Sequence, residues 1–246
     1  MKQKAILLLG LAVLTLCSLS ASAQDKYLFN HVAVGVEAGT TGFGVELSAP
    51  LTHYITLRTG FTTMPQFSYD DDVNYTSHGN KEKVNVEGKL HISDWKFLAE
   101  VYPFRSKGFH LTAGFYVGKE EMITAENTED IKGLEPNEGL EIGDYLVRPD
   151  ADGVARANLT VKSFKPYLGI GWGRSISDKH RLGFSFDMGV QFWGNPTVNA
   201  FSPDDNRWVK VHTTDTDVDD LNKALDTISG FKMWPVLSLR LAYRIF

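Results

Sequence analysis

The feature that most constrains the fold is a period-two alternation of side-chain character, which recurs in eight segments of the chain. Successive side chains of a β-strand point to opposite faces, so each of these segments predicts a strand. Residues 182–192 show the alternation most clearly, with a large apolar residue at every second position. The predicted strands cover residues 31–39, 42–49, 54–61, 95–102, 109–118, 168–173, 182–192 and 237–244.

The two faces of these strands differ in a way that a water-soluble barrel does not explain. One face is bulky and apolar, as at Phe184 and Phe186, while the other combines glycine with single charges, as at Gly183 and Asp187. Glycine has a poor strand propensity and adds no solubility, but it fits the crowded lumen of a narrow barrel. We therefore predict an all-β fold, an eight-stranded antiparallel up-and-down transmembrane β-barrel whose large apolar side chains face lipid.

The lengths of the connections support the same fold. The connections after the second, fourth and sixth strands are short: residues 50–53, 105–108 and 175–180. Those after the third, fifth and seventh strands are long: residues 64–88, 119–158 and 194–233. Short turns on one side and long loops on the other are typical of outer-membrane barrels. Only residues 40–41, after the first strand, break this pattern, which otherwise places both termini on the periplasmic side.

Two local patterns lie within the long connections. Residues 149–153 have the composition of a turn, so the fifth and sixth strands are expected to extend beyond the bilayer as a hairpin. Residues 217–229 carry Leu221, Leu225 and Ile228 at helical spacing, after a run of aspartates and before Gly230. They predict a short helix in the last outer loop.

Residues 1–23 have the pattern of a secretory signal peptide. Lys2 and Lys4 precede an apolar run, and the small residues 21–23 form a cleavage site before Gln24. The apolar run is too short for a membrane helix, and Leu16 stands where a lipoprotein signal requires a small residue. The predicted mature chain is one barrel domain, residues 24–246. Its formal net charge of −5, counted over the whole chain, argues against nucleic acid as a partner.

Six segments of the chain carry a resemblance to known proteins: residues 102–104, 108–114, 166–173, 183–190, 235–239 and 242–244. They resemble a family of small bacterial outer-membrane β-barrels, similar in architecture to the OmpA-type membrane domain. The resemblance implies an integral outer-membrane protein of a Gram-negative cell without a settled activity. Phe246 and Tyr243 resemble the C-terminal aromatic signal that the barrel-assembly machinery reads, although Ile245 shifts the tyrosine by one place. The resemblance thus implies that machinery, outer-membrane lipid and lipopolysaccharide as partners.

The inward faces of the predicted strands also carry eight charged residues. They are Glu37, Glu46, Arg58, Lys96, Glu100, Asp187, Arg240 and Arg244. They could form a gate or an ion path. We expect instead a network of lumenal salt bridges, because an unpaired buried charge is costly and side chains nearly fill an eight-stranded barrel. No wide pore is therefore predicted.

One small constellation suggests an enzyme as a third alternative. His91 and Ser93 are two residues apart and share a strand face, and Glu121 is expected to lie opposite them on the next strand. A serine, a histidine and a carboxylate could act as nucleophile, base and orienting group on an ester-linked acyl chain of lipid A. Polar residues at strand ends are common, so we expect no enzyme.

Acidic clusters in the long connections do not predict a metal site. They occur at residues 70–72, 120–121, 129–130 and 215–220, and residues 150–153 resemble only a fragment of an EF-hand loop. The histidines show no zinc-binding spacing. We predict no metal and no cofactor. The expected role is that of a monomeric, porin-like cell-envelope barrel acting through structure or through its outer loops. The alternative is a narrow channel or a binding cavity for a small hydrophobic molecule.

Overall fold

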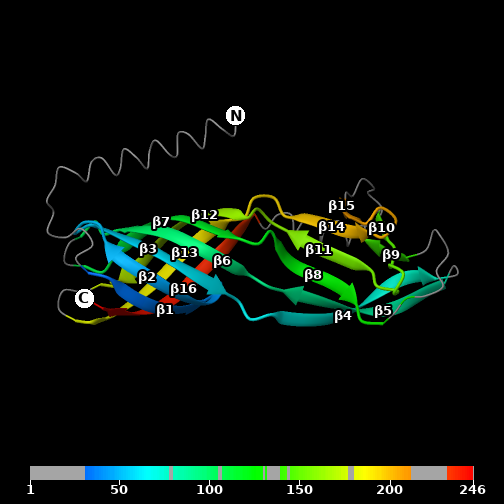
Figure 1. The fold of residues 1–246 in the computed structure, drawn as a ribbon, viewed down its shortest axis with the longest axis horizontal. Coiled ribbons are helices and arrows are strands. Elements are labelled where there is room, and N and C mark those ends of the chain that lie inside the picture. Colours follow the sequence, from blue (N-terminus) through cyan, green and yellow to red (C-terminus); the bar gives the residue numbers. More distant parts are fainter. Residues whose placement is uncertain are drawn as a thin grey trace, which may run out of the picture.

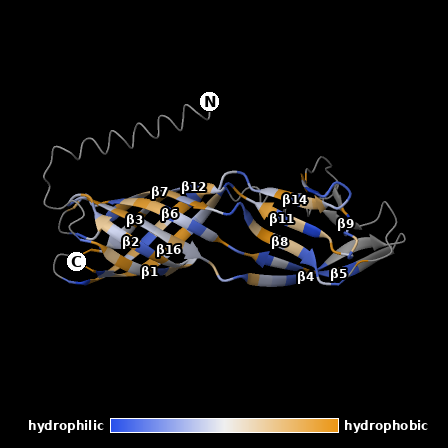
Figure 2. Cartoon of the chain, in the orientation of Figure 1, coloured by the Kyte–Doolittle hydropathy of each residue, from blue (hydrophilic) through white to orange (hydrophobic). Residues whose placement is uncertain are grey.

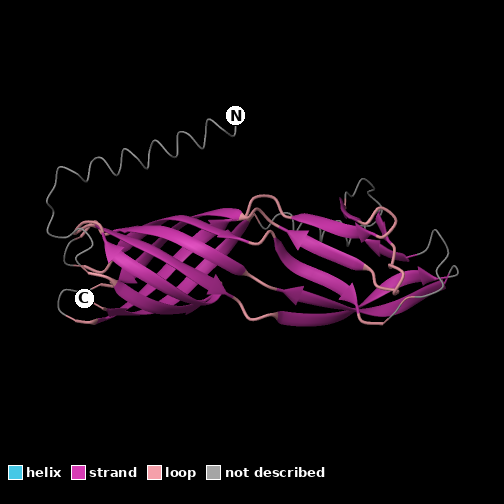
Figure 3. Cartoon of the chain, in the orientation of Figure 1, coloured by secondary structure: helices cyan, strands magenta, loops and turns pink. Residues whose placement is uncertain are grey.

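The computed structural model describes residues 31–77, 80–104, 107–129, 131, 139–142, 145–176, 180–211 and 232–245, and all regular elements in these ranges are strands (Figure 3). The predicted signal peptide, the predicted helix at 217–229 and Phe246 lie outside the described residues. No helix of the described part has the length and apolar character to cross a membrane.

Eight antiparallel strands close into a barrel, as the alternation predicts (Figure 1). They are β1 (Ala33–Gly39), β2 (Gly42–Pro50), β3 (Ile55–Thr63), β6 (Ser93–Val101), β7 (His110–Gly118), β12 (Phe164–Gly173), β13 (Leu182–Phe192) and β16 (Met233–Arg244). Each strand pairs with the barrel strands that precede and follow it in the chain, and β1 pairs with β16 to close the barrel. The register of closure places Glu37 opposite Arg240.

The polarity of the barrel wall is inverted relative to a soluble barrel. On β1, Ala33, Gly35 and Glu37 are buried toward the lumen, whereas Val34 and Val36 point outward. Hydrophobic and hydrophilic residues alternate along the barrel strands (Figure 2), and many of the hydrophobic ones are exposed. Its exposed large side chains include Phe43, Val45, Leu47, Leu57, Trp95, Phe97, Leu111, Leu168, Trp172, Phe184, Leu239 and Leu241. A surface of this kind suits hydrocarbon rather than water.

The sequence suggested that the long connections are loops. They form instead a second sheet of eight strands beyond one end of the barrel (Figure 1). Its strands are β4 (Phe67–Ser77), β5 (Asn80–Leu90), β8 (Glu121–Asn127), β9 (Gly139–Ile142), β10 (Tyr145–Val147), β11 (Arg156–Thr160), β14 (Thr197–Ser202) and β15 (Arg207–Lys210). Residues 70–72, named above as an acidic cluster in a long connection, lie within β4, where pairing with β5 outweighs their poor strand propensity. We call this end of the barrel the sheet end, and the opposite one the turn end.

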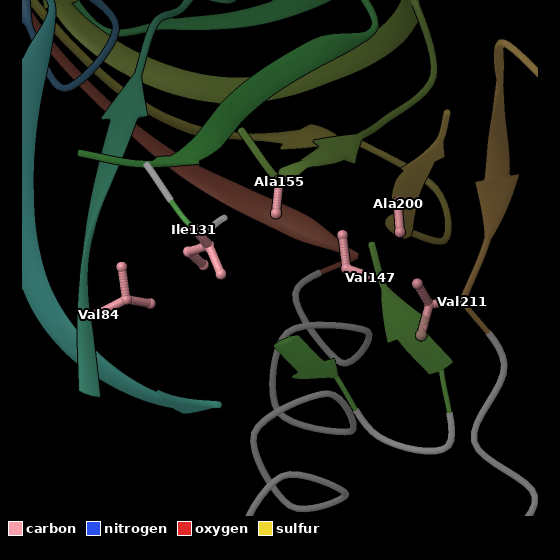
Figure 4. Close-up of a cluster of buried hydrophobic side chains, with 6 residues drawn as sticks. All are labelled: Val84, Ile131, Val147, Ala155, Ala200 and Val211. Atoms are coloured by element: carbon pink, nitrogen blue, oxygen red, sulfur yellow. The ribbon is translucent and has the colours of Figure 1, made fainter. Parts of the chain in front are cut away.

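The predicted hairpin beyond the fifth and sixth barrel strands is confirmed, because β8 pairs with β11. The turn at residues 149–153 is also present, where the backbone N–H of Gly153 donates to the carbonyl of Asp150 at 2.9 Å. The second sheet has an apolar core of its own (Figure 4). This core consists of Val84, Ile131, Val147, Ala155, Ala200 and Val211.

Candidate functional site

The structure brings seven of the eight predicted inward charges together in the barrel lumen. Glu37, Glu46, Arg58, Lys96, Glu100, Asp187 and Arg240 come from β1, β2, β3, β6, β13 and β16, and all seven are buried. With His110 of β7 they form a connected group, here called the lumenal ion cluster. The eighth predicted residue, Arg244, is partly buried at the turn end of β16, opposite Ala33.

Two arginines form the centre of the lumenal ion cluster. Arg58 lies 2.9 Å from a carboxylate oxygen of Glu46 and 2.7 Å from one of Glu100. Arg240 reaches the same two carboxylates at 3.0 and 2.6 Å and binds Asp187 at 2.7 Å. Each guanidinium group therefore bridges carboxylates from different strands. This geometry uses the planar fork of arginine, which donates in several directions at once.

Lys96 adds a third permanent cation to the cluster. Its ammonium group lies 2.7 Å from Glu46 and also contacts Glu37. Glu37 in turn lies 3.8 Å from Arg58, so the same carboxylates are shared between the lysine and the arginine. Unpaired charges at such depth would be strongly destabilising, whereas here every carboxylate of the cluster faces at least one cation.

His110 completes the cluster and was not predicted as part of it. Its Nε2 atom lies 2.9 Å from a carboxylate oxygen of Asp187, and its Nδ1 atom lies 3.0 Å from the carbonyl of Gly108. Both partners can accept a hydrogen bond from the ring. The cluster thus joins four carboxylates to two arginines, one lysine and this histidine. The alternation along the predicted strand 109–118 places His110 on the inward face. That alternation is the sequence signal that could have assigned it to the cluster.

Glycines make room for this cluster, as the composition of the inward face predicts. A Cβ atom added at Gly171 would lie 2.3 Å from Nε2 of His110. One added at Gly44 would lie 2.8 Å from a carboxylate oxygen of Glu37. The lumen is packed so closely that a methyl group at Gly171 or Gly44 would collide with these side chains.

Glu100, His110 and Asp187 could in principle hold a metal ion, because one ligand atom from each lies within 4.8 Å of the others. Both carboxylates of this set are already bound by guanidinium groups. Oxygen Oε1 of Glu100, for example, accepts hydrogen bonds from both Arg58 and Arg240. A divalent cation would have to displace two arginines, so this set of ligands suits an ion-pair network.

The turn end of the lumen is closed by side chains around the cluster. Ser175, in the connection between β12 and β13, accepts a hydrogen bond from Arg240 at 2.7 Å. Tyr102 donates its hydroxyl to Glu100 at 2.7 Å, and the guanidinium group of Arg174 lies 4.1 Å from its ring centroid. These contacts connect a turn directly to the buried charges.

Toward the sheet end, two further groups of side chains fill the lumen. Leu98, Tyr116, Tyr167 and Val236 form an apolar cluster, in which the two tyrosine rings meet edge to face at 5.6 Å. Lys165 and Asp94 form a second buried ion pair at 2.6 Å. Sequence reasoning missed this pair because both residues precede the predicted starts of their strands. The lumen is thus occupied from end to end by paired charges and packed apolar groups.

The three residues of the enzyme alternative lie at the sheet end, outside the lumen. Ser93 begins β6 opposite Thr63, and the backbone N–H of His91 donates to the carbonyl of Met122 at 2.8 Å. Glu121 begins β8, where its carboxylate accepts a hydrogen bond from Asn158 at 3.5 Å. In the described part of the chain, no hydrogen bond connects the side chains of His91, Ser93 and Glu121.

Comparison with solved structures finds outer-membrane β-barrel proteins. The chain is similar to CarO of Acinetobacter baumannii, with 22% identity and a TM-score of 0.51 over 89% of this chain and 99% of that one. CarO2 of the same organism gives 21% identity and a TM-score of 0.50, over 87% and 98%. These likenesses show the fold.

A major outer membrane protein of Thermus thermophilus matches at 16% identity with a TM-score of 0.33, over 87% of this chain and 98% of that one. No protein-family description matches the chain, and no curated protein sequence matches it. The likeness to the OmpA-type membrane domain therefore stays a prediction from the sequence.

Proposed function

We propose that the chain is an integral outer-membrane β-barrel of a Gram-negative cell, exported by its signal peptide and closed to permeation along its axis. Its role is then non-enzymatic: it contributes to envelope structure, and its second sheet offers a surface for interactions outside the cell. The observation that carries this proposal is the inversion of polarity, with the buried side chains of the lumenal ion cluster inside and an apolar wall outside. Such a wall gains stability from hydrocarbon and loses it in water.

The filled lumen is the reason for favouring a closed barrel over a channel. Each cation of the lumenal ion cluster is bound by carboxylates at hydrogen-bonding distance, and the tightest contact of Arg240 is 2.6 Å. Opening a path would require breaking several buried ion pairs at once, each with a large desolvation cost. The alternative, a narrow channel or a binding cavity for a small hydrophobic molecule, would require open space among these buried ion pairs.

Planar-bilayer recording tests the closed barrel directly. Protein that shows heat-dependent migration on a denaturing gel, and is therefore folded, is reconstituted at increasing amounts. We expect no discrete single-channel steps above the background of protein-free bilayers. A reproducible unitary current from the folded protein would contradict a closed barrel. Purified protein that stays monomeric in water without detergent would contradict membrane insertion itself.

A further inference from the structure

Two lysines project from the outer wall at the sheet end of the barrel. In the pairing of β7 with β12, Val117 lies opposite Phe164, and both side chains point outward. Two residues further along, toward the sheet end, the same alternation brings Lys119 opposite Lys162. Both lysines are exposed. We call this pair the lysine rim.

Backbone hydrogen bonds hold the two lysines of the rim opposite one another. The N–H of Gly118 donates to the carbonyl of Ser163 at 3.1 Å, and the N–H of Val161 donates to the carbonyl of Glu120 at 2.7 Å. The lysines are the residues between these two bonds on their respective strands. Cross-strand neighbours on one face have Cβ atoms about 4.5–5.5 Å apart, so the two lysine side chains start next to each other.

The lysine rim has no compensating ion pair within the described residues. The ion pairs of that part of the chain do not include either ammonium group. The side-chain stem of Lys162 lies over Gly194, where an added Cβ atom would be 2.8 Å from the lysine Cδ atom. Gly194 has a positive φ of 78°, so the backbone itself favours glycine at this point. The stem of Lys162 therefore packs against the backbone of Gly194, which carries no side chain.

Three aromatic rings form a contiguous group, here called the column, across β6, β7 and β12 on the turn-end side of the lysine rim. Phe115 is in the centre, with ring centroids 5.4 Å from Phe97 on one side and 5.1 Å from Phe164 on the other. Phe97 and Phe164 are about half exposed. In a membrane this column would contact acyl chains, while the lysines above it would lie at the level of the headgroups.

Other polar groups surround the lysine rim. The register that pairs Asp94 with Gly118 places Ser93 opposite Lys119, so the serine hydroxyl adds an uncharged donor beside the rim. The acidic neighbours are Glu120 and Glu121, which are exposed, and the latter accepts a hydrogen bond from Asn158. Among the described contacts, neither carboxylate is bound to a lysine of the rim.

We propose that the lysine rim binds the phosphate group of a phosphorylated lipid in the surrounding leaflet, with the acyl chains lying along the column of Phe97, Phe115 and Phe164. This inference rests on the membrane insertion proposed above. Two lysines on neighbouring strands, beside an exposed apolar column, match a ligand that joins an anionic head to hydrocarbon. A soluble anion would use the lysines without the rings.

Native mass spectrometry of the detergent-solubilised protein tests the head-group specificity. The probes are lipid A with two phosphates and the same lipid after removal of both phosphates, each added at equal concentration. We expect the bisphosphorylated lipid to be retained about tenfold better by the wild-type chain, as two surface lysines near an anionic head would give. Equal retention of the two lipids would overturn the proposal.

A pair of double variants locates the site. Lys119→Gln/Lys162→Gln is expected to lose the preference for the phosphorylated lipid. The control Lys107→Gln/Lys210→Gln also removes two positive charges, one from an exposed residue near the turn end and one from β15. This control is expected to keep the preference for the phosphorylated lipid. A preference that survives in the first variant would overturn the assignment to the rim. If that variant fails to fold, the wild-type comparison of the two lipids decides alone.

Flotation of proteoliposomes separates this proposal from the proposed function. Wild-type protein that floats with vesicles and shows heat-dependent migration is inserted, and its lipid preference then bears on the lysine rim alone. Protein that does not float contradicts insertion, and the rim proposal is contradicted with it.

Discussion

At the scale of single residues, Arg240 is the most connected side chain of the lumen. It joins Asp187, Glu46 and Glu100 at distances between 2.6 and 3.0 Å and donates to Ser175 as well. The alternation along residues 237–244 was enough to predict that Arg240 points inward. The identity of its partners could not be predicted, because three of them depend on how β2, β6 and β13 are placed across the barrel.

Replacing Arg240 by methionine should strongly destabilise the barrel. The substitution leaves three carboxylates with one cation fewer in a buried site, and removal of one partner from a buried ion pair costs about 3–5 kcal/mol. Urea unfolding of the protein in lipid vesicles measures the free energy of unfolding. The matched control is Arg207→Ala, which removes an exposed pair with Asp205 and should cost less than about 1 kcal/mol. Similar small losses in both variants would contradict the importance of the lumenal ion cluster.

At the scale of elements, the eight barrel strands were predictable because one face of each is consistently large and apolar. Residues 182–192 were predicted with the same bounds that β13 has. The second sheet was not predicted. On β4, Asp70, Asp71 and Asp72 follow one another, so no period-two contrast exists there, and the strand is held by its pairing with β5. Pairing of this kind is determined by the fold and leaves little trace in a single sequence.

The turn that precedes β11 offers a pH-dependent prediction. Backbone N–H groups of Val154 and Asp152 donate to Asp150, whose carboxylate also contacts Arg156. The hydrogen bond from Val154, with smaller contributions from Arg156 and Asp152, holds the pKa of Asp150 below its ordinary value of 3.8. The stabilisation is therefore complete above that value and is lost as the pH falls through the lower pKa of the folded state.

Amide hydrogen exchange of Val154, corrected for the intrinsic pH dependence, measures this effect. Protection should stay constant from pH 7 to about pH 4 and decrease at lower pH, since the unperturbed carboxyl titrates at about 3.9. Asp150→Asn keeps an acceptor but cannot titrate, so its protection should be lower at neutral pH and independent of acid. A wild-type profile that begins to decrease well above pH 4 would contradict the assignment.

At the scale of the whole molecule, the barrel and the second sheet have separate interiors. The sheet packs around Val84, Val147 and Ala200, among others, while the barrel encloses the lumenal ion cluster. Between them lies a third cluster at the sheet end of the barrel. It consists of Met64, Ile92, Met122, Val161 and Trp193, with the stacked ring of Trp234 at 4.7 Å from that of Trp193. We therefore expect that closure of the barrel does not depend on the sheet.

Replacing residues 67–89 by a short glycine-containing turn should leave the barrel intact. The deletion removes β4 and most of β5, but it keeps the backbone bond between Met64 and Ile92 and all nine register pairs between β3 and β6. Heat-dependent migration on a denaturing gel should persist in the shortened chain. Its loss, under conditions in which the full chain folds, would show that the second sheet is required for closure.

The position of Arg240 on the last strand has a consequence for the order of assembly. Until β16 is seated between β13 and β1, Glu46, Glu100 and Asp187 surround a space that lacks one of its positive charges. A wall of seven strands is therefore electrostatically incomplete, and water must remain inside it to solvate the excess negative charge. We therefore expect pairing of β16 to displace that water and to neutralise the interior in one step, which favours all-or-none closure of the barrel.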